Sequence, residues 1–131
     1  MATKKLVRTG TKWEPLVGYC RAVRVGPHIA VSGSAPVDEK GQLVGPNDPY
    51  LQAKRCIEII AAALEEAGAG LQHVVRTRMF VTDISRWEEI ARAHQEAFAE
   101  IMPATSMVEV SRLIGDGMIV EIEADAIVSD Q

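Results

Sequence analysis

The chain has 131 residues, of which 47% are hydrophobic and 24% are charged, and its formal net charge is −4. A chain of this length fits one hydrophobic core, so residues 1–131 are predicted to form a single domain. The acidic balance argues against a general nucleic-acid or anionic-membrane binder, because such proteins present basic surfaces. No apolar stretch approaches the roughly 18 residues of a membrane-spanning helix. The start of the chain lacks the apolar segment of a secretory signal, and two cysteines make no disulfide framework, so we expect a cytoplasmic protein.

Two strands are predicted near the N-terminus, at residues 19–25 and 28–32. Gly26 and Pro27 lie between them, and this pair of residue types is typical of a tight turn. A polar turn with short extended arms is predicted over residues 37–44. This part of the chain is therefore expected to be β structure.

A first helix is predicted from residue 49. Asp48 can accept hydrogen bonds from free amide groups at the helix start, and Pro49 suits the first helical position because it has no amide proton to leave unpaired. Apolar residues then recur at helical spacing over residues 53–64. Gly68 is expected just beyond the end of this helix, where a left-handed backbone conformation is common.

The rest of the chain combines strands with one further helix. Asp83 or Ser85 is predicted to cap the second helix, and Pro103 is predicted to stop it. The remaining predicted strands lie at residues 73–82, 106–113 and 118–128. This order of elements predicts an α+β domain, in which one mixed sheet carries two helices on one face.

The face of the sheet away from the helices mixes charges with apolar residues. Acidic side chains at Glu121, Glu123 and Asp125 share one side of the last strand, and Arg76 and Arg78 share one side of the middle strand. The opposite side of the middle strand, which is predicted to face the helices, carries Val75, Thr77, Met79 and Val81. The charged face is either solvated or an interface between copies of the chain, and the residue types leave both interpretations open.

Few motifs point to a specific chemistry. The histidines are scattered and neither cysteine has a nearby partner, so no metal or cofactor is predicted. His94 lies on the apolar stripe of the second helix and is interpreted as a packing residue. Glu121 lies mid-strand between apolar neighbours, where a partly buried carboxylate can have a raised pKa, although a surface or paired Glu is commoner.

Residues 102–110 (MPATSMVEV) and 120–124 (VEIEA) resemble the Rid family, the YjgF-like reactive-intermediate deaminases once described as endoribonucleases L-PSP. The resemblance extends over residues 19–128. It implies a chorismate-mutase-like α+β subunit with a mixed six-stranded sheet and two helices on one face. It further implies a homotrimer with a central barrel and with small-molecule clefts at the subunit interfaces. Canonical members of the family hydrolyse 2-imino acids and their enamine tautomers to 2-oxo acids and ammonia without a metal or cofactor.

Four site residues follow from this resemblance. Glu121 matches the carboxylate that orients or activates the attacking water, a role suited to a fixed hydrogen-bond acceptor. Tyr19 matches a tyrosine of the ligand pocket, and Ser32 and Gly33 match a turn that presents backbone and hydroxyl groups to the ligand. These assignments predict a cofactor-independent hydrolase of C=N bonds.

Two further positions depart from the family pattern. Thr105 stands where active deaminases carry the arginine that holds the substrate carboxylate, and Met107 stands where a cysteine is common. A guanidinium forms two charge-assisted hydrogen bonds with a carboxylate, whereas a threonine hydroxyl forms at most one neutral bond. Arg21 is a candidate replacement for the missing arginine, but we expect it to pair with an acidic residue of the sheet instead.

The sequence therefore leaves more than one function open. The first is a hydrolase of imines, enamines or related intermediates whose substrate lacks the usual carboxylate or places it differently. The second is a non-catalytic protein that binds or senses a small molecule on the same trimeric scaffold. RNA cleavage is disfavoured, because the chain is acidic and has no basic stripe and no acid–base histidine pair.

Overall fold

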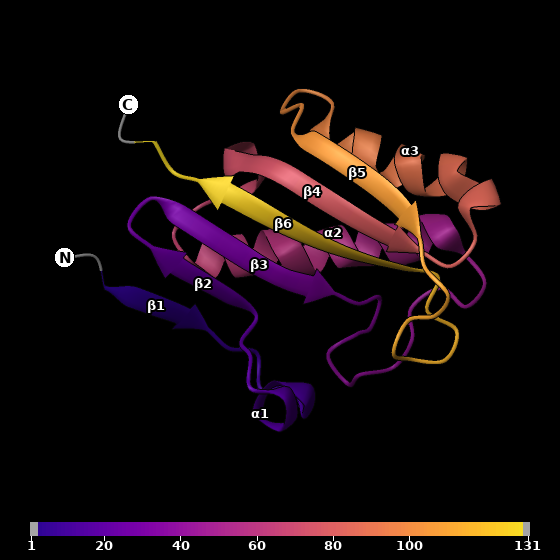
Figure 1. Cartoon of the computed structure of the whole chain (residues 1–131), viewed down its shortest axis with the longest axis horizontal. Helices are drawn as coiled ribbons and strands as arrows, with labels where there is room; N and C mark the ends of the chain where they lie inside the picture. Colours follow the sequence, from indigo (N-terminus) through magenta and orange to yellow (C-terminus); the bar gives the residue numbers. More distant parts are fainter. Residues whose placement is uncertain (1–2, 130–131) are drawn as a thin grey trace.

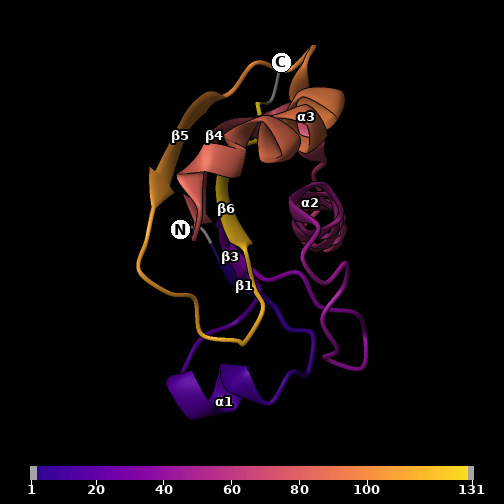
Figure 2. The ribbon, with the colours of Figure 1, turned by 90° about the vertical axis from the view of Figure 1, so that its right-hand side faces the viewer.

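A computed structural model describes residues 3–129, which form one six-stranded mixed sheet with two long helices on the same face (Figures 1 and 2). The strands are β1 Lys4–Val7, β2 Ala22–Val25, β3 His28–Ser34, β4 Val74–Val81, β5 Ala104–Glu109 and β6 Val120–Ile127. The helices are α1 Trp13–Val17, α2 Pro49–Glu66 and α3 Trp87–Phe98, with short 3-10 turns at η1 Leu71–His73 and η2 Ile84–Arg86. The spatial order of the strands is β1-β2-β3-β6-β4-β5, and the β4–β5 pair is parallel. The predicted α+β architecture is confirmed.

Helix α2 begins and ends as the sequence predicts. The Asp48 side chain accepts a hydrogen bond from the amide of Leu51, and Pro49 is the first helical residue. Gly68 follows the C-cap Ala67 with a φ of 86°, a conformation that glycine adopts without steric cost. In Figure 2, α2 and α3 lie on the same side of the sheet, whose other side they leave open.

The start of α3 differs from the prediction by one short turn. Asp83 does act as a cap, but it accepts from the amide of Ser85 and opens the 3-10 turn η2, so that α3 itself begins at Trp87. The helix ends at Phe98, well before Pro103. Met102, between them, has a φ of 55°, so the chain has already left the helical conformation when it reaches the proline.

The N-terminal elements β1 and α1 were not predicted. Strand β1 adds an edge to the sheet by pairing with β2, and α1 is a single short helix apart from the main layers (Figure 1). Several predicted strands are also too long: β2 begins at Ala22 rather than at residue 19, β5 ends at Glu109 rather than at residue 113, and β6 begins at Val120 rather than at residue 118. In these segments an extended pattern of residues continues beyond the ladder of backbone hydrogen bonds.

The core lies between the sheet and the two helices. In β6 the inward residues Val120, Ile122, Ala124 and Ala126 are each at most 2% exposed. The prediction that Val75 shares the covered face is wrong, because β4 contains a bulge. Val74 pairs with Ala126 and Arg76 with Asp125, so Val75 is an extra residue and is 43% exposed.

The open face of the sheet carries charges that pair within the chain. Arg78 Nη1 lies 2.9 Å from Glu123 Oε2 and 3.3 Å from Asp125 Oδ2. Exposed apolar residues on the strands of this face include Val25 and Ile127. Within residues 3–129, no helix has the length and apolar character needed to cross a membrane.

Candidate functional site

The carboxylate of Glu121 lies against the backbone of Gly33. Glu121 follows Val120 and precedes Ile122, which are both fully buried, so its own side chain points to the open face. The partner strand β3 has an irregular register between Val31 and Ser34, which brings Gly33 beside this carboxylate. A Cβ atom at position 33 would overlap Glu121 Oε2, so the carboxylate occupies its place because Gly33 has no side chain.

Arg21 joins this group from the segment before β2. Its side chain is only 8% exposed, and Nη2 donates a hydrogen bond of 2.9 Å to the Gly33 carbonyl. The guanidinium carbon also lies 5.6 Å from the centre of the Tyr19 ring, which brings the predicted pocket tyrosine into the cluster. Among residues 3–129 no carboxylate lies within ion-pair distance of Arg21, and its Nε is buried without a hydrogen-bond partner. The expected pairing of Arg21 with an acidic residue of the sheet therefore stays a prediction for contacts between copies of the chain.

The environment of Glu121 favours its protonated form. Burial raises the pKa of this carboxyl, the positive charge of Arg21 opposes that rise, and the negative charge of Glu123 adds to it. A carboxylate with a raised pKa is a stronger base than an exposed one. Glu121 is therefore suited to accept a proton from water or from a ligand.

Ser32 has a structural role in the same cluster. Its hydroxyl donates a hydrogen bond of 2.7 Å to the Cys20 carbonyl, and its amide donates to the Arg21 carbonyl at 2.9 Å. These contacts tie β3 to the segment that carries Tyr19 and Arg21. The Ser32 proton is thus engaged within the protein, whereas its oxygen lone pairs remain available.

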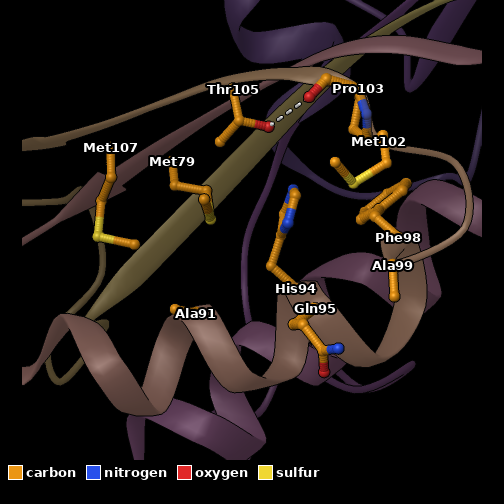
Figure 3. Close-up of a pocket in the computed structure, with 10 residues that line it drawn as sticks. All are labelled: Met79, Ala91, His94, Gln95, Phe98, Ala99, Met102, Pro103, Thr105 and Met107. Carbon is orange, nitrogen blue, oxygen red and sulfur yellow. Dashed lines mark hydrogen bonds between the residues drawn. The ribbon is translucent and has the colours of Figure 1, made fainter.

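Thr105 and Met107 lie on the opposite face of the sheet, under α3. There they line an open cavity of about 380 Å³, whose walls also include Met79, His94, Phe98 and Met102 (Figure 3). The register of the parallel β4–β5 pair places Thr105 beside Thr77 and Met107 beside Met79. No charged residue lines the cavity, so its character is apolar with a few neutral polar atoms.

The sequence did not reveal a chain of hydrogen bonds at one side of this cavity. The fully buried Thr77 has its Oγ1 2.9 Å from His94 Nε2 and 2.7 Å from Thr105 Oγ1. The His94 ring also lies 4.5 Å from the ring of Phe98, and burial lowers the pKa of His94. The one signal in the sequence was a polar residue, Thr77, at an inward position of an apolar strand.

The six residues predicted for the site therefore fall into two clusters. Tyr19, Ser32, Gly33 and Glu121 lie in the open-face cluster, which also contains Arg21. Thr105 and Met107 lie in the cavity cluster, which also contains Thr77 and His94. The sheet separates Glu121 from Thr105, so one chain does not bring all six residues together. Among residues 3–129 no group of three histidine, cysteine or acidic side chains is placed to hold a metal ion.

The six-stranded mixed sheet with two helices on one face is the architecture of YjgF-like domains. The chain belongs to the endoribonuclease L-PSP family, whose family model matches residues 9–128. The Rid-family resemblance found in the sequence is thereby confirmed.

Three relatives illustrate this similarity. A RutC family protein of Pyrococcus abyssi is 40% identical, over 94% of this chain and 96% of that protein. The crystal structure of a member of the YjgF/YER057c/UK114 family from Mycobacterium tuberculosis is 46% identical, with a TM-score of 0.88 over 96% of this chain and 100% of that one. A Salmonella typhimurium protein named 2-iminobutanoate/2-iminopropanoate deaminase is 36% identical, over 83% of this chain and 86% of that protein.

Proposed function

We propose that the protein is a hydrolase that deaminates an imine, an enamine or a related reactive intermediate, with Glu121 as the residue that orients and deprotonates water. The observation that carries this proposal is the Glu121 carboxylate, which is half-buried, has a raised pKa and is held against Gly33 beside Arg21. The deaminase name of the Salmonella relative supports the same class of reaction.

The reaction follows from the chemistry of the C=N bond. Water adds through its oxygen to the carbon, and Glu121 takes one water proton and delivers it to the nitrogen, which gives a neutral carbinolamine. In the second step Glu121 takes the proton of the new hydroxyl group and delivers it to the nitrogen. The C–N bond then breaks, the nitrogen leaves as ammonia, and the former water oxygen becomes the carbonyl oxygen of the product, so that Glu121 is regenerated and no cofactor is consumed.

The substrate is atypical because Thr105 replaces the arginine that binds a carboxylate in active deaminases. Charge-assisted hydrogen bonds contribute about 1.5–3 kcal/mol each, against about 1 kcal/mol for a neutral bond. The replacement therefore weakens carboxylate binding by about 10–1,000-fold. The uncharged cavity around Thr105 and Met107 suits an uncharged or apolar group at this place.

The proposed site is completed between copies of the chain. The open-face cluster and the cavity cluster are separated by the sheet, and two copies can present them to one ligand. We therefore propose a cytoplasmic homotrimer whose three sheets line a central barrel and whose ligand clefts lie at the subunit interfaces. Tyr19, Ser32, Gly33, Thr105 and Met107 would bind the ligand, and Glu121 would act on water.

The test is a deaminase assay on 2-imino acids generated in situ by an amino-acid oxidase. We expect weak or no turnover by the wild type and a clear gain for Thr105→Arg, which restores the carboxylate-binding group. Adding Glu121→Gln to Thr105→Arg should abolish the gain while sedimentation shows an unchanged assembly. Full activity of the double variant would remove Glu121 from the mechanism.

The second candidate is a non-catalytic protein that binds or senses a small molecule. Thr105 and Met107 favour it, because the scaffold and cavity persist without two groups typical of the active enzymes. A metabolite that raises the melting temperature, with no turnover of any imine by the wild type or by Thr105→Arg, would support this function. RNA cleavage, to which the family name refers, stays disfavoured by the net charge of −4.

A further inference from the structure

The hydroxyl of Thr77 connects His94 to Thr105. Thr77 is 0% exposed, and its Oγ1 has two hydrogen-bond partners in the described part of the chain, His94 Nε2 at 2.9 Å and Thr105 Oγ1 at 2.7 Å. A hydroxyl carries one proton, and the buried proton of Thr77 has no other acceptor in the described part of the chain, so Thr77 donates to one of these partners and accepts from the other. The two contacts therefore have a common direction, which His94 determines.

Each direction gives the cavity a different polar group. When Nε2 is unprotonated, Thr77 donates to it and Thr105 donates to Thr77, so that Thr105 offers the cavity only lone pairs. When Nε2 carries a proton, both bonds reverse and the Thr105 proton turns away from Thr77. Its remaining acceptor in the described chain is then the Pro103 carbonyl, at 3.5 Å (Figure 3).

The distances favour the first direction for a neutral ring. A hydroxyl hydrogen bond is best near 2.7–2.8 Å, so the Thr105 proton bonds well to Thr77 and poorly to Pro103. In this state the ring proton is on His94 Nδ1.

We propose that His94 is a positioning residue that, through Thr77, makes the Thr105 hydroxyl a hydrogen-bond acceptor while the imidazole is neutral and a donor once it is protonated. The ligand class that fits this cavity at neutral pH is a small, uncharged and largely apolar molecule with an N–H or O–H group directed at Thr105. The inference rests on the proposed function only in placing the ligand in this cavity.

No charged side chain lines the cavity beside His94, so its protonation depends on burial and on the pH. His94 contacts Thr77 and Phe98, and the other residues that line the cavity with it, from α3, β4, β5 and the segment between α3 and β5, are all uncharged. Burial lowers the pKa of His94 from its ordinary value of 6.5, so the ring is neutral at pH 7. The reversal is therefore expected below pH 6.5.

The direction of the hydrogen bonds is tested directly by long-range 1H–15N NMR of the 15N-labelled protein, which distinguishes protonated from unprotonated ring nitrogens. At pH 7.5 we expect the signal of an unprotonated Nε2 and a protonated Nδ1 for His94, identified by its loss in His94→Gln. A protonated Nε2 at this pH overturns the proposal. No turnover is measured, so the result is independent of any failure of the role proposed for Glu121.

The ligand class is tested with two probes of the same shape, 2-pyrrolidinone, which has an N–H donor, and γ-butyrolactone, which lacks it. By calorimetry at pH 7.5 the wild type should bind the lactam about fivefold more tightly, the value of one neutral hydrogen bond. At a pH low enough to protonate His94, the affinity for the lactone should rise relative to the affinity for the lactam. Equal affinities at pH 7.5, or no binding of either probe, overturn the proposal.

Variants distinguish the effect of the hydrogen bonds among His94, Thr77 and Thr105 from the effect of the shape of the cavity. Thr77→Ser keeps the hydroxyl and should keep the preference for the lactam, whereas Thr77→Val should lose both the preference and its pH dependence. Thr77 is buried, so the exposed Thr105→Val provides a second variant that does not depend on core packing. A preference for the lactam that persists in Thr105→Val contradicts the proposal.

Discussion

The carboxylate of Glu121 takes the space that a side chain at Gly33 would need, so the two residues, on neighbouring strands, determine each other's arrangement. Arg21 strengthens this relationship, since it holds the Gly33 carbonyl and its charge acts on Glu121. The position of the proposed base is thus set by the backbone of β3 as well as by its own strand. Changes at position 33 can therefore test Glu121 without altering it.

Gly33→Ala should move the Glu121 carboxylate while leaving the fold intact. The backbone of Gly33 does not need glycine for its conformation, and the new methyl group meets the end of a flexible side chain. We expect a loss of stability below about 1 kcal/mol, measured by urea unfolding. In the Thr105→Arg background, activity on 2-imino acids should fall about 100-fold, because a small misplacement of a reacting group is costly. In the Glu121→Gln background the same change should have no further effect on rate, and an additive effect would refute the link.

The raised pKa of Glu121 predicts a cost in stability at neutral pH. The folded state binds this proton more tightly than the unfolded state, so stability falls as the pH rises from 4.5 through the folded-state pKa. Glu121→Gln removes the buried charge and should be more stable than the wild type at pH 8. Urea unfolding at pH 8 and pH 4.5 should show that the difference shrinks at the lower pH. A variant that is less stable at pH 8 would contradict this expectation.

Local signals in the sequence predicted the parts of the fold that depend on local contacts. Asp48, Pro49 and Gly68 act within a few residues of themselves, and the structure has each of them in its predicted place. The bulge that exposes Val75 depends instead on pairing with β6, which alternation within one strand does not record. Edge strand β1 was missed for a similar reason, since it is short and is defined by its partner β2.

The candidate site likewise contains residues that the sequence identified and contacts that only the folded structure shows. Glu121 and Gly33 were assigned through the family resemblance, whereas the role of His94 was not foreseen. The contacts among His94, Thr77 and Thr105 combine a helix with two strands, so they exist only once the register of β4 and β5 and the packing of α3 are set. A threonine among apolar inward residues is a weak signal by itself.

Gln52 is predicted to stabilise the two neighbouring loops that precede α2 and β6. Its buried side chain donates to the carbonyls of Gly45 and Gly117 and accepts from the amide of Ile119. Gln52→Leu removes these hydrogen bonds from the Gly117 carbonyl and the Ile119 amide, whereas the Gly45 carbonyl keeps its bond from the Asp48 amide. Each backbone group left unpaired costs about 1–3 kcal/mol when it stays buried. We expect a loss of about 3 kcal/mol in urea unfolding. The exposed Gln72→Leu is the control and should change stability by less than about 0.5 kcal/mol.

Glu14 should behave in the opposite way to Glu121, although both carboxylates are partly removed from water. Burial raises the pKa of Glu14, but hydrogen bonds from Thr9 and Thr11 outweigh it, and the net pKa lies below the ordinary value of 4.5. A lowered pKa means that the stabilisation is fully present above pH 4.5 and is lost as the pH falls through the folded-state value. Glu14→Gln should therefore lose about 1 kcal/mol at pH 7, with a difference from the wild type that narrows at pH 3. The exposed Glu65→Gln serves as the control, and an equal loss in both variants would show that general charge, not the contacts of Glu14, is responsible.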